Sequence, residues 1–267
     1  MSRTKVEIIG GISLLGVEKP SVHCREGLVK EMCGRINICT DGYSKEEIAQ
    51  IEENTKKIQK GSIDTKSRSI YAEENNVCIL SKNCIVDTYV CSLEITKKEY
   101  IEEILGGENQ SVWIEKVGEL VLRGYAVELL PKTTANQIQE LRLSAKEIRK
   151  TESIWVGMMK WLVLYGYAVK LLPKLRFHEE TQMEELHLSA YCAGQITEIL
   201  ELKSIWIGKV KKLVLYGYAV KLLPKLGFHE ETQMEEFRLG AEGADQITEI
   251  RKTEDRSIWV GKVKSLD

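Results

Sequence analysis

Two histidines occupy the same place in a repeated FHEET segment, where His178 and His229 are each followed by two glutamates. A histidine beside carboxylates could hold a metal ion, but HEET lacks the HExxH spacing that places two histidines on one helix face. Consecutive residues at a helix start also point in different directions around the axis. We therefore expect a solvated first turn here and no metal site.

The seven cysteines lie mostly at the start of the chain, with six before residue 92 and only Cys192 after it. Their odd number and the absence of any CxxC pair argue against a disulfide framework, so we expect reduced, buried thiols. His23 beside Cys24, with Cys33 and Asp41 further on, could supply a base and a nucleophile. Neighbours in sequence point apart, however, and IIGGIS is not a phosphate-binding loop. The sequence predicts no catalytic, metal-ligating or cofactor-binding residue.

Composition narrows the class of protein. The 267 residues are 43% hydrophobic and 29% charged, which supports folded domains. A formal net charge of -2 gives no basic excess, so nucleic acid is not an expected partner. No apolar run is long enough to span a membrane and no secretory segment is evident, which favours a cytoplasmic location.

Internal repeats fill the C-terminal part of the chain. The tripeptide GYA recurs at Gly124, Gly166 and Gly217, in steps of 42 and 51 residues. Tryptophan marks the same phase at positions 113, 155, 206 and 259, in steps of 42, 51 and 53. We predict tandem repeats of about 42–53 residues over 108–267, as three copies and a truncated fourth.

Each repeat predicts two helices. Trp206, Val210, Leu213 and Val214 follow helical spacing, with Ser204 placed to cap the start and Gly217 to close the end. A second helix is expected over FHEETQMEEFRLGAEG, and a short helical piece over 246–250. The segment 218–223 could be helix or strand. The fold class predicted is mainly α, a short solenoid-like α-helical repeat array. The alternative is a repetitive α/β arrangement, because a helix closed by glycine can also lead into a parallel strand.

Residues 1–107 predict a small, cysteine-containing α+β domain. Alternation predicts a strand over 35–40, and a capping box at Ser44 predicts a helix to about residue 60. Residues 21–33 could form a helix, 77–80 and 84–95 a hairpin, and 96–105 a further helix. Glycines 106 and 107 mark the expected boundary before the repeats.

The segments QMEELHLSAYCAG and QMEEFRLGAEG resemble QMEEIRLGLE-type repeats of uncharacterised proteins from Gram-positive gut bacteria and their mobile elements. The resemblance covers at most residues 110–267. It implies a helix that leads through a turn into an apolar segment ending near a proline, as GYAV followed by LLP does here. It implies no active site.

Three residues are candidates for binding a partner. Trp161 stands where the other copies have Glu119, Lys212 and Ser265, so its indole is expected on the surface. Lys209 and Lys212 place positive charge on the exposed side, either for binding or as a solvated face with weak ion pairs. By contrast, the tryptophans 113, 155, 206 and 259 begin the apolar stripe and are predicted in the core.

These observations favour a non-enzymatic interaction protein that uses its helical repeat surface to bind another protein. One alternative is an enzyme or small-ligand-binding protein centred on the N-terminal domain. The other, based on the resemblance alone, is a mobile-element protein that sequesters a host factor.

Overall fold

A computed structural model describes residues 6–7, 29–32, 35–38, 44–46, 49–50, 53, 63–106, 113–133, 138–149, 153–253 and 258–266. The chain forms two compact units, Met1–Asn136 and Gln137–Asp267. The domain division predicted at 107/108 stays a prediction.

The first unit is built on a mostly parallel sheet. Its central strands β4 (Ile63–Glu73), β5 (Cys84–Ile95) and β6 (Trp113–Gly124) are adjacent and parallel. Helices follow each of them: α2 (Asn75–Asn83), α3 (Lys98–Leu105) and the 3₁₀ helix η1 (Tyr125–Lys132). On the other side of β4 lie β1 (Val6–Glu7), β2 (Val29–Met32) and β3 (Arg35–Ile38), of which only the β2–β3 pair is antiparallel.

Several predictions for this unit can be checked. Of the strand predicted over 35–40, Arg35–Ile38 is confirmed and the rest lies outside the described residues; of the helix predicted over 96–105, Lys98–Leu105 is confirmed. The described residues between 45 and 53 are helical. The hairpin is wrong, because residues 77–80 belong to helix α2 and β5 pairs in parallel with β4. Residues 29–32 are a strand where a helix was considered. The remainder of 21–33 lies outside the described residues.

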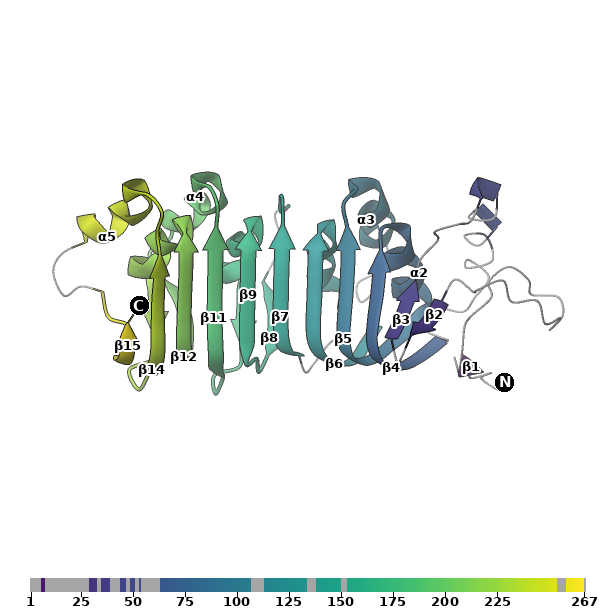
Figure 1. The fold of residues 1–267 in the computed structure, drawn as a ribbon, viewed down its shortest axis with the longest axis horizontal. Coiled ribbons are helices and arrows are strands. Elements are labelled where there is room, and N and C mark those ends of the chain that lie inside the picture. The colour runs from purple at the N-terminus through teal and green to yellow at the C-terminus, as the bar shows by residue number, and fades with distance from the viewer. Residues whose placement is uncertain are drawn as a thin grey trace. The chain divides into compact units, whose positions relative to one another are not determined.

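The second unit contains a fully parallel sheet in the order β7-β9-β11-β12-β14-β15, with its helices behind the strands in Figure 1. The strands are β7 (Ile138–Ala145), β9 (Trp161–Gly166), β11 (Gln182–Ala190), β12 (Ile205–Gly217), β14 (Gln233–Gly240) and β15 (Lys262–Leu266). Two short strands, β8 (Ile154–Gly157) and β10 (Leu175–Phe177), pair with each other, and β13 (Leu226–Phe228) pairs with the start of β12.

The two complete repeats of this unit have the same element order. In each, a strand leads into a 3₁₀ helix, a three-residue strand, a second long strand and a short helical segment. The helical parts are η2 (Tyr167–Lys174), η3 (Ala193–Gln195) and α4 (Thr197–Leu200) in one repeat, and η4 (Tyr218–Lys225), η5 (Ala244–Ile247) and α5 (Thr248–Lys252) in the next. The sequence repeat is therefore a structural repeat that adds two neighbouring strands to the sheet.

This architecture contradicts the prediction of a mainly α fold and of a helical solenoid. Both predicted repeat helices are strands, β12 and β14, whereas the helical piece over 246–250 is confirmed. The segment 218–223 is 3₁₀ helix. The chain shares one feature with the repetitive α/β arrangement that was the alternative prediction: its parallel strands are joined by short helical segments.

A break in strand alternation explains why the helix prediction was wrong. Buried positions in β12 are three residues apart at Val210 and Leu213, and then two apart at Leu215. The same step of three separates Met183 from Leu186 in β11, where the Lys160 carbonyl accepts hydrogen bonds from two successive amides, those of Glu184 (2.7 Å) and Glu185 (3.2 Å). Such a bulge shifts the phase of a strand. Steps of three and four residues then resemble the period of an amphipathic helix.

One face of this sheet forms the core. Leucines at matching register positions of β7, β9, β11 and β12 are fully buried, and they are Leu141, Leu143, Leu162, Leu164, Leu186, Leu188, Leu213 and Leu215. The 3₁₀ helices η2 and η4 each add one Ala, one Val and two Leu side chains to them. Burial of these side chains removes apolar surface from water, the main stabilising term in folding. Alternation sends the intervening side chains to the opposite face.

Candidate functional site

The outward face of the second unit's sheet is arranged in rows, because residues of neighbouring strands are in register and equivalent residues of the repeats recur on every second strand. The first row, across β7, β9, β11, β12 and β14, is Glu140, Trp161, Glu185, Lys212 and Glu236. The second row is Arg142, Val163, His187, Val214 and Arg238. The third row is Ser144, Tyr165, Ser189, Tyr216 and Gly240. We call these three rows the sheet face.

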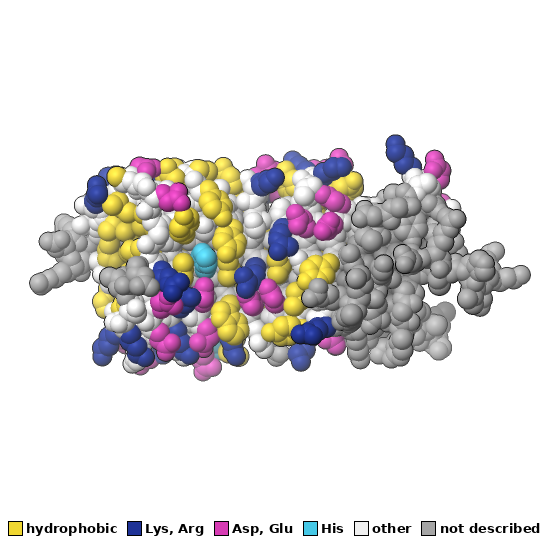
Figure 2. All heavy atoms as spheres, in the orientation of Figure 1, with side chains coloured by type: hydrophobic (Ala, Val, Ile, Leu, Met, Phe, Trp, Pro, Cys, Tyr) yellow, Lys and Arg dark blue, Asp and Glu magenta, His cyan; other side chains and the backbone are white. Residues whose placement is uncertain are grey.

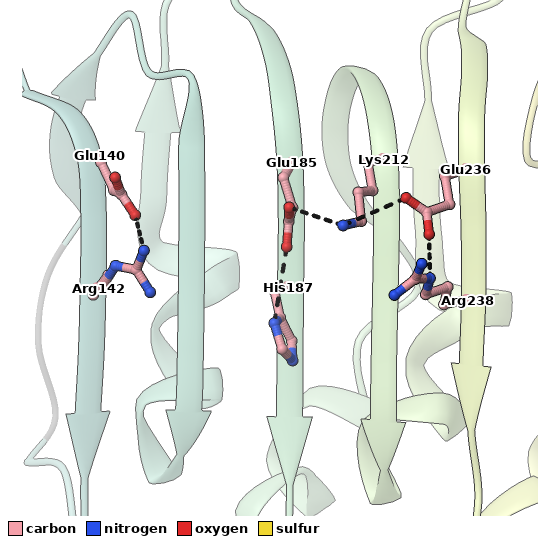
Figure 3. A network of polar contacts seen from close by, with 7 residues as sticks. All are labelled: Glu140, Arg142, Glu185, His187, Lys212, Glu236 and Arg238. Atoms are coloured by element: carbon pink, nitrogen blue, oxygen red, sulfur yellow. Dashed lines mark ion pairs between the residues drawn. The ribbon is translucent and has the colours of Figure 1, made fainter.

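Ion pairs connect the first two rows (Figure 3). Lys212 Nζ lies between two carboxylates, 3.3 Å from Glu185 Oε2 and 3.4 Å from Glu236 Oε2. Along the strands, Arg142 pairs with Glu140 and Arg238 with Glu236. Three carboxylates are thus matched by three cations, so that the sheet face has no strong net charge.

His187 takes the position that arginine occupies in the two neighbouring copies of its strand. Its Nδ1 is 4.0 Å from Glu185 Oε1, and its side chain is 24% exposed. Burial lowers the pKa of His187 from its ordinary value of 6.5. Glu185 opposes that change, whereas Lys212 and Arg142 reinforce it. In the second row, His187 can therefore change its charge with pH, whereas the arginines on either side of it, Arg142 and Arg238, remain cations.

Aromatic side chains lie among these charges. The Tyr165 ring meets His187 edge-on, with ring centroids 5.3 Å apart. The Tyr216 ring lies over Gly240 on the neighbouring strand, where a Cβ atom would come within 2.5 Å of Tyr216 Cδ2. Its hydroxyl donates to Glu242, and this hydrogen bond raises the pKa of Tyr216. Figure 2 shows hydrophobic, acidic and basic side chains interspersed over the strands of this unit.

Two of the three predicted binding residues come together on the sheet face. Trp161 and Lys212 both neighbour Glu185 in the first row. Trp161 is only partly exposed, and the Lys160 ammonium lies over it, 5.8 Å from the ring centroid. Lys209 is not in a row; it pairs with Glu231 near the start of β12. Both Lys209 and Lys212 form ion pairs with glutamates, as the alternative prediction of an ion-paired surface states.

The tryptophan prediction needs correction. Trp155, Trp206 and Trp259 are 62%, 63% and 48% exposed, so these side chains are not in the core. The buried neighbours of Trp206 are Ile205 and Ile207, as expected of a strand. The side chain of Trp113 lies outside the described residues.

The histidines of the two FHEET segments lie in turns. His178 and His229 accept hydrogen bonds at Nδ1 from the amides of Glu180 and Glu231, within their own turns. Within the described part of the chain, no group of three His, Cys, Asp or Glu side chains could hold a metal ion. His23, Cys24, Cys33 and Asp41 fall outside the described residues. No described helix is long and apolar enough to cross a membrane.

Sequence reasoning missed most of the sheet face, including Arg142, Tyr165, Tyr216 and Arg238. A signal was present, because LVLYG in β12 and FRLG in β14 alternate between buried and outward residues. Those stretches cover five of the 13 residues of β12 and four of the 8 residues of β14, and the phase shift before them concealed the pattern.

Known proteins offer no guide to this surface. Comparison with family models, curated proteins and solved structures found no match.

Proposed function

We propose that the protein is a non-enzymatic interaction protein whose sheet face binds another protein. The observation that supports this most directly is the register of the three rows. It collects two arginines and three aromatic side chains on one face of the sheet: Arg142, Arg238, Trp161, Tyr165 and Tyr216. Tryptophan, tyrosine and arginine are the residues most often found at the energetic centre of protein interfaces. The sheet also orders the backbone that carries these side chains, which reduces the entropic cost of binding.

The balance of charge favours protein over nucleic acid as the partner. Nucleic-acid binding depends on an excess of lysine and arginine that neutralises phosphates. On the sheet face each arginine is paired with a glutamate, and Lys212 lies between two glutamates. A partner with its own mixed charges can exchange these pairs for intermolecular ones.

We also propose a cytoplasmic location. Cys78, Cys91 and Cys192 are free thiols in the described part of the chain. Free thiols persist in reducing compartments.

A photo-crosslinking experiment tests the proposed function. A benzophenone amino acid replaces Tyr216 on the sheet face or, as the control, exposed Lys252 on α5, and irradiation is carried out in the native host. The position at Tyr216 should yield a discrete protein adduct that the position at Lys252 does not. With that protein purified, the double variant Tyr165→Ser, Tyr216→Ser should bind about tenfold more weakly or worse.

Two outcomes would reject the proposal. One is a Lys252→Ala variant that loses as much affinity as the tyrosine double variant. The other is a crosslinked species that consists of nucleic acid.

A further inference from the structure

A cleft of about 460 Å³ lies in the second unit between two strands that do not pair with each other. On one side is β10, which forms a two-stranded sheet with β8. On the other side is the start of β12, which pairs with β13 through Ile205 and Leu226. The lining comes from two stretches, 172–181 and 202–208.

The path of the chain explains why the cleft opens. Strand β11 pairs with β12 from Gln182 and Lys209 onward. Just before β11, residues 178–181 form a turn that is tied to β8. The His178 amide donates to the Gly157 carbonyl at 3.2 Å, and Thr181 Oγ1 donates to the same oxygen at 3.4 Å. Strand β10 therefore stays paired with β8. The first residues of β12 pair with β13 on one side and, among the described strands, with no strand on the side that faces β10.

The lining combines an apolar floor with a basic rim. Leu175, Ile205 and Ile207 are buried in it, whereas Leu202 and Trp206 are exposed at its mouth. The charged residues of the lining are Lys174, Arg176 and Glu179, together with the titratable His178. The cleft thus offers apolar contact and a cationic excess to a ligand.

We propose that this cleft binds an extended, acidic segment of a partner polypeptide as an added β-strand. Facing strand edges present backbone donors and acceptors that such a segment can pair with, and alternate side chains then supply the specificity. Side chains of a strand alternate, so an aliphatic residue can lie on the apolar floor while the next, acidic residue meets Lys174 or Arg176. This site is separate from the sheet face.

The next repeat supplies a matched substitution for the basic rim. Arg176 in KLRFHEET corresponds to Gly227 in KLGFHEET, and both precede a phenylalanine in a three-residue strand. Arg176→Gly therefore installs a residue that the fold already accepts at the equivalent position. For the apolar contact, Trp206→Ala is matched by Trp155→Ala, whose indole is equally exposed but does not line the cleft.

Fluorescence polarisation with defined peptides tests the proposal on the full chain. The probes are fluorescein-labelled, acetylated heptapeptides of alternating valine and aspartate, with a valine–lysine peptide as control. The aspartate peptide should bind at least about tenfold more tightly than the lysine peptide. Arg176→Gly and Trp206→Ala should each weaken that binding about fivefold or more, and Trp155→Ala should leave it unchanged.

Methylation of the peptide backbone distinguishes binding as an added β-strand, which requires backbone hydrogen bonds, from binding through side chains alone. Aspartate peptides N-methylated at alternate residues cannot donate those hydrogen bonds, so they should bind about tenfold more weakly. The proposal is overturned if the aspartate peptide does not bind, if the lysine peptide binds as well, or if methylation or Arg176→Gly has no effect. The Tyr165→Ser, Tyr216→Ser variant should retain peptide binding, so that failure here is distinguishable from failure of the sheet-face proposal.

Discussion

The His187 imidazole packs edge-on against the Tyr165 ring, with their planes inclined by 65°. Because Arg142 and Arg238 hold the equivalent positions on β7 and β14, the repeat accepts a permanent cation there, yet β11 carries a titratable group. The chemical difference between these copies is therefore one of pH response.

A pH dependence of stability follows from the lowered pKa of His187. As the pH falls below 6.5, His187 of the unfolded chain becomes protonated, whereas His187 of the folded chain is protonated only at a lower pH. Between these two pH values the free energy of unfolding therefore decreases as the pH falls. Urea unfolding at about pH 7.5 and 5.5 should show a larger loss for the wild type than for His187→Gln. Equal losses in the two proteins would contradict the assignment.

Alanine substitutions of two adjacent residues test whether residues 205–217 form the strand β12 or the predicted helix. Ile207 is 2% exposed and Trp206 is 63% exposed. We expect Ile207→Ala to lower the free energy of unfolding by about 2–5 kcal/mol and Trp206→Ala by less than about 1 kcal/mol. A helix with Trp206 in its buried stripe predicts the reverse order in the same denaturation experiment.

Gly217 is a position where a side chain should not be tolerated. Its φ is 63°, and a Cβ atom would collide with the Ala190 carbonyl oxygen on the neighbouring strand. Gly217→Ala should therefore cost roughly 2 kcal/mol or more. Gly194→Ala is the control, because its Cβ would meet only the Tyr167 hydroxyl at 3.6 Å. If both variants unfold at the same urea concentration, the backbone at Gly217 is not as described.

The ion pairs of Lys212 should contribute modestly to stability. Lys212→Met leaves Glu185 and Glu236 without the cation between them. We expect a loss of about 1 kcal/mol or less in the free energy of unfolding, and a smaller loss in about 1 M salt, which screens partly exposed charges. Lys252→Met, which removes an ion pair with Glu249 on α5, should change stability less. A loss that does not respond to salt would show that packing dominates instead.

Cysteine reactivity should follow exposure. Cys192 is exposed, Cys78 is buried, and burial raises the pKa of Cys91 to about 12. Since the thiolate is the reactive form, iodoacetamide should modify Cys192 of the folded protein and spare Cys78 and Cys91. Mass spectrometry of tryptic peptides checks this, with denatured protein as the reference in which all three react. Rapid labelling of Cys91 in the folded protein would refute its burial.

Local patterns with an unbroken period were predicted correctly. The strand at Arg35–Ile38 alternates strictly, and α3 shows helical spacing within one short segment. The strands of the repeats, β12 and β14, were predicted as helices for a physical reason: a break in alternation shifts the phase of the strand, and a leucine-rich stretch buried on one face suits either element. For the sheet face, Trp161 and Lys212 were singled out individually, but nothing in the linear sequence places them on either side of Glu185.

The sequence by itself determined the repeat, its period of 42 to 53 residues and the recurrence of glycine at 124, 166 and 217, because duplicated sequence preserves those features directly. Tertiary structure decided that each repeat supplies parallel strands, and that Glu140, Lys212 and Arg238 lie on one face of the sheet. Pairing in a parallel sheet joins residues more than twenty positions apart, within one repeat or between successive repeats, and such contacts leave no local period in the chain.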